Sequence, residues 1–418
     1  MNMKKRVDGK TSSAASLHEI LQQCGRIIVI CMILGFFARA GFAVYRANLP
    51  LLGDARLYDQ VAVSIVNGLG FVFKNLPLSD KAPGYSAFLA AIYTVFGHSF
   101  ISVYLIQSIL SAIVCGATAV LGYAVTRRKG VALLAGLFMA LYPPLALADS
   151  EMFNDSPFGF LVFFLIVLTG WAISSRKIWP WAIGGLMLGL ALYIRPTAIA
   201  FPLIFLVLAL WRRWPLTKAV LGVAILTVVA GLVLMPWAVR NQRLFGVFTP
   251  MPSQGGRVLY CNWSAINMVS SDLGSLPEDV KSKVGDKTGY ERDKIFKKIA
   301  IRQIKSHPGE FVESCFIKIA RQWTNLFWSQ PPSRSTLLFA AVNILLLALA
   351  VPGFWNRNID LLFRGYTLLF VLYVTFIAAV MSSAEPRYAY WTYPFLFVLA
   401  ANTLVSMWLR RKPATQSS

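Results

Sequence analysis

Apolar residues recur along the chain in runs that are long enough to cross a membrane. A helix needs about 20 apolar residues to cross a hydrocarbon core of roughly 30 Å. The predicted spans are residues 26–47, 99–126, 131–148, 156–174, 180–194, 197–211, 218–238, 335–353, 363–382 and 389–409. Arg195-Pro196 separates the fifth segment from the sixth. The two segments are either two short spans or one broken helix.

The pattern predicts an all-α polytopic membrane protein with about ten spanning helices, and with up to roughly thirteen. Composition agrees, because 57% of the residues are hydrophobic and 14% are charged, whereas soluble proteins carry about a quarter charged residues. The first run begins near Arg26, too deep in the chain and too long for a cleaved signal peptide. We expect a tail 1–25, a transmembrane module 26–238 with an outer loop 48–98, a small mixed outer region 239–334, C-terminal transmembrane helices 335–409 and a tail 410–418.

The distribution of positive charge orients the chain. A net charge of +22 is compatible with nucleic-acid binding, but Lys and Arg gather in the tails and in the short loops of one side. They are Lys4, Lys5, Arg6, Lys10, Arg26, Arg127, Arg128, Lys129, Arg176, Lys177, Arg212, Arg213, Lys218, Arg357, Arg364, Arg410, Arg411 and Lys412. This bias predicts that both termini are cytoplasmic. Most other basic residues lie in 239–334, where helices near the membrane surface suit anionic lipid head groups rather than nucleic acid.

The first outer loop, residues 48–98, carries more chemistry than an ordinary connector of a few residues. Asp54 precedes a helical sequence and shares a helix face with Tyr58, so it is either a helix N-cap or a functional acid. Asp80 and Lys81 precede a Pro-Gly turn. They are either a solvated ion pair, or a cation-binding acid followed by a phosphate-binding lysine.

Further polar residues lie at the outer ends of later spans. Asp149, Glu151 and Asp155 share a short turn, in which Asp155 is expected to cap the next span. That leaves Asp149 or Glu151 to face a shared cavity. Arg195 and Arg387 each adjoin a proline at a membrane boundary. They either reach to lipid phosphates or form a pair suited to a phosphate ligand.

Other residues carry weaker signals. Arg39 lies inside the first span and needs a partner or a cavity. Cys261 and Cys315 share the outer region, either as a disulfide or as two free thiols. Gly185 and Gly189 form a GxxxG, which most simply serves helix packing. The chain has no P-loop, Rossmann or zinc-protease motif.

Taken in order, these motifs resemble the bacterial GT-C fold glycosyltransferases, in particular the protein O-mannosyltransferases and the lipid A aminoarabinose transferases. The resemblance covers about residues 26–405. It rests on Asp54 with Tyr58, an AxxIxxGxGF helix at 62–71, Pro83-Gly84-Tyr85, Phe96-Gly97, Glu151, Arg195-Pro196, PWAVRNQRLFG at 236–246 and EPRYAYWTYP at 385–394.

The resemblance implies transfer of a hexosyl or pentosyl unit from a polyprenyl-phosphate-linked donor to a lipid, glycan or protein acceptor. The reaction would take place on the periplasmic face of the bacterial inner membrane. Asp54 would be the base of an inverting displacement, assisted by Glu151 or Asp149.

The resemblance also assigns the remaining site residues. Lys81, Arg195 and Arg387 would hold phosphate. Tyr58, Tyr85 and Tyr388 would contribute to the substrate site, and Asp80 would meet a divalent cation, as in some relatives. The family often has a second acid directly after the first, where this chain has Ala55.

A lipid or solute transporter or flippase is the alternative. Transporters usually show repeat halves with matched broken helices near the midplane of the membrane. Here the acids and arginines gather at the outer boundary instead, which favours the transferase. An inactive relative that serves as a membrane scaffold is a third possibility.

Overall fold

The structure, a computed structural model, describes residues 17–265, 276–285, 287–324, 333–356, 358–381 and 385–411. Within these ranges the protein is helical apart from turns and one small antiparallel hairpin, β1 (Val72–Phe73) and β2 (Leu76–Pro77). The predicted all-α membrane fold is confirmed.

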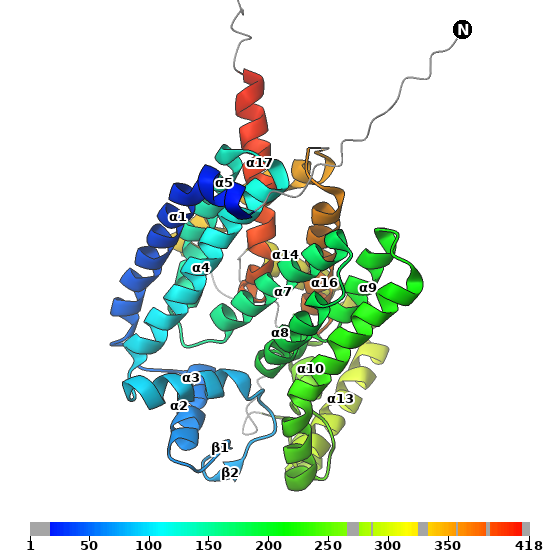
Figure 1. Cartoon of the computed structure of the whole chain (residues 1–418). Helices are drawn as coiled ribbons and strands as arrows, with labels where there is room; N and C mark the ends of the chain where they lie inside the picture. Colours follow the sequence, from blue (N-terminus) through cyan, green and yellow to red (C-terminus); the bar gives the residue numbers. More distant parts are fainter. Residues whose placement is uncertain are drawn as a thin grey trace, which may run out of the picture.

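The predicted spans correspond to the long helices of a bundle (Figure 1). Among the described residues, seven helices are long and apolar enough to cross a membrane. They are α1 (Leu17–Arg46), α4 (Phe100–Thr126), α7 (Asp155–Ser175), α10 (Leu216–Phe245), α15 (Arg334–Ala350) with η3 (Val351–Trp355), α16 (Leu361–Met381), and η4 (Pro386–Thr392) with α17 (Tyr393–Arg411). An eighth consists of α5 (Lys129–Leu141) and α6 (Pro143–Asp149), which meet at a bend of 52°.

The interrupted segment 180–211 forms two helices rather than one. They are α8 (Pro180–Ile194) and α9 (Phe201–Trp211), with the short η1 (Pro196–Ala198) between them. The GxxxG of α8 packs against α10 as predicted, because a Cβ on Gly185 would lie 2.6 Å from the carbonyl oxygen of Leu226.

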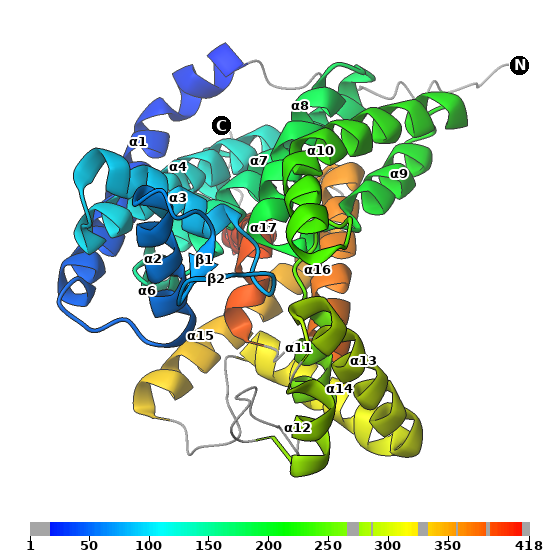
Figure 2. The ribbon, with the colours of Figure 1, turned by 90° about the horizontal axis from the view of Figure 1, so that it is seen from below.

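The C-terminal helix, α17, lies at the centre of the bundle (Figure 2). Residues 391–403 of η4 and α17 are buried without interruption, as expected for a helix that is apolar on every side. Seen along the bundle in Figure 2, α17 lies near the middle, with α7 and α16 beside it. The segment that carries Arg387 therefore leads directly into the core.

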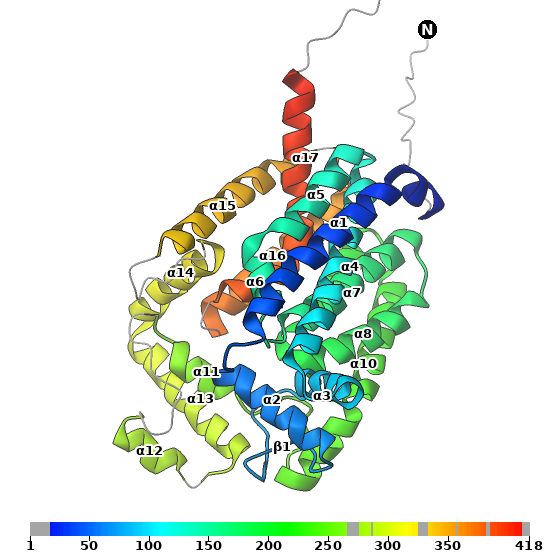
Figure 3. The ribbon, with the colours of Figure 1, turned by 90° about the vertical axis from the view of Figure 1, so that its left-hand side faces the viewer.

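Six further helices lie outside the spans. In the first loop they are α2 (Gly53–Val66) and α3 (Gly84–Phe96), and in the region 239–334 they are α11 (Gly255–Asn262), α12 (Glu278–Val284), α13 (Gly289–Ser306) and α14 (Pro308–Thr324). Helix α14 lies nearer the middle of the bundle, and the other five are found toward one end, opposite the end at which α1 begins and α17 finishes (Figure 3). This is the side that the charge bias predicts to be outer, and we call it the outer end.

Candidate active site

Asp54 and Lys81 form an ion pair across the first outer loop. The Lys81 ammonium donates to both Asp54 carboxylate oxygens, at 2.9 and 3.0 Å. The lysine side chain is only 10% exposed, whereas that of Asp54 is half-exposed. The carboxylate therefore has one side on a buried cation and the other accessible.

Two of the simpler interpretations of this loop are wrong. Asp54 does not cap α2, because it is the second residue of that helix and the N-cap is Leu52, with no side-chain cap. Asp80 does not pair with Lys81, since its carboxylate lies 3.5 Å from the guanidinium of Arg257. In both cases the true partner is distant in sequence and close in the fold.

The surroundings of Asp80 do not fit a divalent cation. The described residues include no group of three or more His, Cys, Asp or Glu side chains that could hold a metal ion. One Asp80 carboxylate oxygen is buried without a hydrogen-bond partner, but the cationic Arg257 beside it opposes a second positive charge.

The Pro-Gly-Tyr turn fixes this loop against the bundle. A Cβ on Gly84 would lie 2.7 Å from the Tyr193 carbonyl oxygen, so glycine allows α3 to approach α8. The buried Tyr85 hydroxyl donates to Gln107 of α4 at 2.8 Å. The Tyr85 ring also meets Tyr58 edge to face, with centroids 5.0 Å apart. Lys81 is thus held just before a rigid turn.

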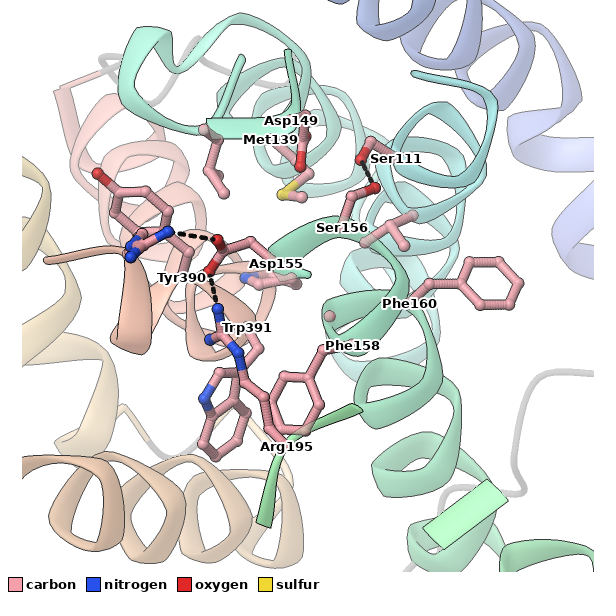
Figure 4. A pocket seen from close by; sticks show the side chains of 15 residues that line it. Ser111, Met139, Asp149, Asp155, Ser156, Phe158, Phe160, Arg195, Tyr390 and Trp391 are labelled. Atoms are coloured by element: carbon pink, nitrogen blue, oxygen red, sulfur yellow. Dashed lines mark hydrogen bonds and ion pairs between the residues drawn. The ribbon is translucent and has the colours of Figure 1, made fainter. Parts of the chain in front are cut away.

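The two outer arginines converge on one carboxylate, that of Asp155 (Figure 4). Arg195 lies 2.6 Å from one Asp155 oxygen and Arg387 lies 3.6 Å from the other. Arg195 also donates twice to Asn154, at 2.6 and 2.8 Å. The ring of Tyr388 lies beside both guanidinium groups, 5.3 and 5.5 Å from its centroid. A single acid therefore holds two cations together.

Asp155 is the site residue that the sequence interpretation missed. It was expected to cap α7, but it is the first residue of that helix, and the N-cap Asn154 makes no side-chain cap hydrogen bond. Its side chain is 6% exposed and lines a small pocket of about 30 Å³ with Ser111, Ser156 and Tyr390. An acid before Ser-Pro looks the same in sequence whether it caps a helix or binds arginine.

The other two acids of this turn have partners of their own. Asp149 binds the fully buried Arg39 at 2.7 Å, which gives that intramembrane arginine its expected partner. Glu151 pairs with Arg46 at the end of α1, and its side chain is about one-third exposed. Gln107 donates to the backbone carbonyls of both acids, each at 2.9 Å. The turn is therefore fixed from three sides.

The pKa of the Tyr58 phenol is influenced both by Asp54 and by the two outer arginines. Burial raises the pKa of its phenol above the usual range, and the carboxylate of Asp54 raises it further. The guanidinium groups of Arg195 and Arg387 act in the opposite direction. The phenol is thus protonated near neutral pH and can donate a hydrogen bond.

An apolar groove of about 620 Å³ adjoins the Asp155 pocket, and Phe160 lines both. Side chains of α3, α4, α7, α8 and α10 form its walls. Arg240 is the only charged residue among those that line it, and its guanidinium lies 4.2 Å from the centroid of Trp237. The sequence interpretation did not single out Arg240, although it lies in the quoted motif at 236–246.

Residues 80–239 match the family model of dolichyl-phosphate-mannose-protein mannosyltransferases. The predicted resemblance to the GT-C glycosyltransferases is confirmed. The matched segment includes Lys81, Asp155 and Arg195, and it ends one residue before Arg240. The match covers less than half of the chain. No curated protein matches the chain.

The chain is also similar to solved structures, and the first of these has a similar fold. An oligosaccharyltransferase from Archaeoglobus fulgidus, tethered to an acceptor peptide with an NVT sequon, superposes with a TM-score of 0.51 at 12% identity. The match covers 93% of this chain and 50% of the archaeal protein, so the chain spans half of that protein's length. ArnT from Cupriavidus metallidurans bound to undecaprenyl phosphate superposes with a TM-score of 0.43 at 13% identity, over 93% of this chain and 78% of ArnT.

Cys261 and Cys315 are both free thiols in the structure, so the disulfide alternative is not observed. The hairpin β1–β2 precedes Lys81 in the first loop. The described residues of the region 239–334 form no strand.

Proposed function

We propose that the protein transfers a hexosyl or pentosyl unit from a polyprenyl-phosphate-linked donor to an acceptor hydroxyl. The reaction would occur on the periplasmic face of a bacterial inner membrane, with both termini cytoplasmic. The observation that carries the proposal is that Tyr58 interacts electrostatically with both Asp54 and the Arg195–Arg387 pair, and that the pocket of this pair adjoins an apolar groove. The matched family is itself described by a lipid-phosphate-linked mannose.

The donor divides naturally between the two cavities. Its polyprenyl chain suits the groove, because the groove is apolar and large. Its phosphate suits Arg195 and Arg387, since a guanidinium group presents several donors in a planar fork. Phe160 lines both cavities, which would place the head group next to the point where the tail begins.

Asp54 has the properties of a general base. Its carboxylate is half-exposed, so an acceptor hydroxyl can reach it, and Lys81 stabilises its charged form. The acceptor oxygen attacks the anomeric carbon and gives its proton to Asp54. The bond from that carbon to the phosphate oxygen breaks on the opposite face, and the configuration inverts.

The leaving group is a lipid phosphate, which gains negative charge as the bond breaks. Arg195 and Arg387 would stabilise that charge, and Lys81 would contribute from the other side of Tyr58. In the free protein Asp155 holds the two guanidinium groups at one place, so little reorganisation is needed when phosphate binds.

Of the two candidates for a second acid, Glu151 suits an assisting role better than Asp149. The Glu151 side chain is about one-third exposed, whereas that of Asp149 is 5% exposed and is neutralised inside the bundle by Arg39. We assign Tyr58, Tyr85 and Tyr388 to the walls of the substrate site. We assign Asp80 to a structural pairing with Arg257.

A transfer assay with purified protein in detergent tests this function. Lipid-linked sugars extracted from cells that lack the protein serve as donors, together with the glycoconjugates of the same cells as acceptors. Asp54→Asn is expected to abolish transfer while expression and membrane insertion stay normal. Unchanged transfer by this variant would remove the base assignment.

The same assay separates the two classes of function. A micelle has no two compartments, so a transporter or flippase cannot produce a product there. Sugar transfer by the wild-type protein in detergent is therefore expected only from a transferase. If no donor in the extract is consumed, although the protein is folded, the transporter alternative is favoured.

A further inference from the structure

Helix α14 is amphipathic, but it buries its polar side and exposes its apolar side. Its polar side chains Ser314, Lys318 and Gln322 face the protein and are 0%, 2% and 0% exposed. Its apolar side chains Val312 and Phe316 face outward and are 54% and 70% exposed. Spacings of three and four residues place each set on one side of the helix, opposite the other set.

The polar side of α14 is held by the outer ends of membrane helices. The Lys318 ammonium donates to the Ala379 carbonyl of α16 at 3.3 Å, and the Trp323 indole donates to Thr375 at 2.9 Å. The helix also packs against η4, which carries Arg387. Figure 3 shows α14 beside the outer ends of α15 and α16.

Water does not explain this orientation. A helix between protein and water buries its apolar side, because that removes apolar surface from water. The exposed side of α14 carries Val312 and Phe316, with the exposed Glu313 at its edge, so the boundary between lipid and water suits it better than water alone. The surface of the neighbouring spans continues the same property, since Phe376 of α16 and Leu338 of α15 are 59% and 61% exposed. The spans that pack against α14 thus also expose apolar side chains.

The preceding helix, α13, presents a basic surface. It buries Phe296 and Ala300 against α11, and its opposite side is exposed and mainly basic. The one acid on that side, Glu291, lies in the first turn and accepts a hydrogen bond from the Thr288 backbone N–H. None of the cations on that side forms an ion pair within the part of the chain that the structure describes. They are Lys294, Lys297, Lys298, Arg302 and Lys305.

We propose that α13 and α14 form one lipid-binding surface that docks on the outer leaflet of the membrane. The apolar side of α14 contacts acyl chains, and the basic side of α13 contacts the head groups of anionic phospholipids. His307 alone joins the two helices. The charged head group and the acyl chains of one lipid layer can therefore contact adjacent helices. This surface does not depend on the transfer reaction.

The surface also has a consequence for the candidate active site. Because α14 packs between the lipid and η4, lipid contact holds the segment that positions Arg387. The region 239–334 is then not uniformly soluble. Helices α11 to α13 lie outside the membrane, and α14 lies within its outer boundary.

Depth measurements on the full-length protein in lipid nanodiscs test the position of α14. An environment-sensitive fluorophore is placed at Phe316→Cys, in a background without reactive native cysteines. The matched control carries it at Lys283→Cys on α12, where the side chain is 53% exposed in the same region. We expect lipids with a nitroxide on the acyl chain to quench position 316 and aqueous iodide to quench position 283. Equal iodide quenching at both positions would overturn the proposal.

Lipid analysis tests the preference for anionic head groups. The protein is reconstituted with equal amounts of phosphatidylglycerol and phosphatidylcholine, extracted gently, and its retained lipids are measured. We expect several-fold enrichment of phosphatidylglycerol for the wild type and its loss in K297E/K298E/R302E. The control K281E/K283E changes lysines of α12 that already pair with Glu278 and Asp279, and it should keep the enrichment.

The result can go against the proposal in two ways. Equal loss of enrichment in both variants would reduce the effect to general charge. Unchanged enrichment in the α13 variant would assign its basic side to another anionic partner, such as an acidic acceptor. Neither outcome depends on sugar transfer, so a failure here is distinguishable from a failure of the proposed function.

Discussion

At the scale of single residues, the candidate site centres on Asp155, which Arg195 and Arg387 contact at unequal distances. Arg195 lies 2.6 Å from this carboxylate and also binds Asn154, whereas Arg387 lies 3.6 Å from it and also pairs with Glu385. Arg195 is thus the structural member of the pair. Arg387 is the member with the looser contact, and it is better placed to turn toward a phosphate.

This difference predicts different effects of the two alanine substitutions. Arg387→Ala should raise the KM for the lipid-phosphate donor about tenfold, which corresponds to about 1.4 kcal/mol, and should change thermal stability little. Arg195→Ala should lower stability by roughly 3–5 kcal/mol, because it removes the closest partner of a buried carboxylate. Steady-state kinetics and thermal unfolding in detergent measure the two effects. An unchanged donor KM in the Arg387 variant would contradict its phosphate role.

Residue roles were also the hardest part to predict from sequence. Asp54 and Asp155 both precede a helix, and a helix cap is the commonest reason for an acid there. Their actual partners, Lys81 and Arg195, are 27 and 40 residues away. Local pattern cannot distinguish a cap from an ion pair, because only the fold shows which distant cation arrives.

At the scale of helices, local pattern is a much better guide. Long apolar runs become long helices wherever they occur, because backbone hydrogen bonds must be satisfied within the segment in lipid. The predicted segments therefore match the observed helices, and Arg195-Pro196 separates α8 from α9. The 52° bend between α5 and α6 was not predicted, although Pro143 and Pro144 lie at it and proline interrupts a helix.

The bend is held by an arginine from another helix. Arg39 of α1 donates to the carbonyls of Met139 and Ala140 at the end of α5, at 3.1 and 3.0 Å. It also binds Asp149 at the end of α6. One fully buried guanidinium group thus joins three helices and satisfies carbonyls that the end of α5 leaves free.

We therefore predict that Arg39→Leu destabilises the protein by about 3–5 kcal/mol, because it leaves Asp149 charged and unpaired in the bundle. The double variant R39L/D149L should recover part of that loss, since it removes the orphaned charge as well. Thermal unfolding of both variants in the same detergent measures the difference. A double variant that is no more stable than Arg39→Leu would show that the carbonyl contacts, rather than the ion pair, carry the effect.

At the scale of the whole molecule, the chain combines a polar site with an apolar groove that no single motif indicates. The groove is built by five helices drawn from residues 83 to 240, so it exists only once the bundle is assembled. The same holds for the reversed orientation of α14, whose composition is that of an ordinary surface helix. What surrounds a helix decides which of its sides is buried.

The groove gives a prediction about the length of the donor lipid. Ala87 is exposed and lines the groove, so Ala87→Trp fills it without crowding the core. If the groove holds the polyprenyl chain, this variant should lose most of the advantage of a long-chain donor over a short-chain one. Its activity with the short-chain donor should stay near the wild-type value, because the tail supplies binding rather than chemistry.

Val95→Trp is the matched control for this substitution. Val95 lies on the same helix and is 74% exposed, but it does not line the groove. It adds the same bulky side chain to α3 at a site open to the surroundings. Transfer rates with long- and short-chain donors, measured for both variants, give the chain-length preference of each. If Ala87→Trp keeps the wild-type preference, the polyprenyl chain binds elsewhere, because a blocked groove cannot distinguish long tails from short ones.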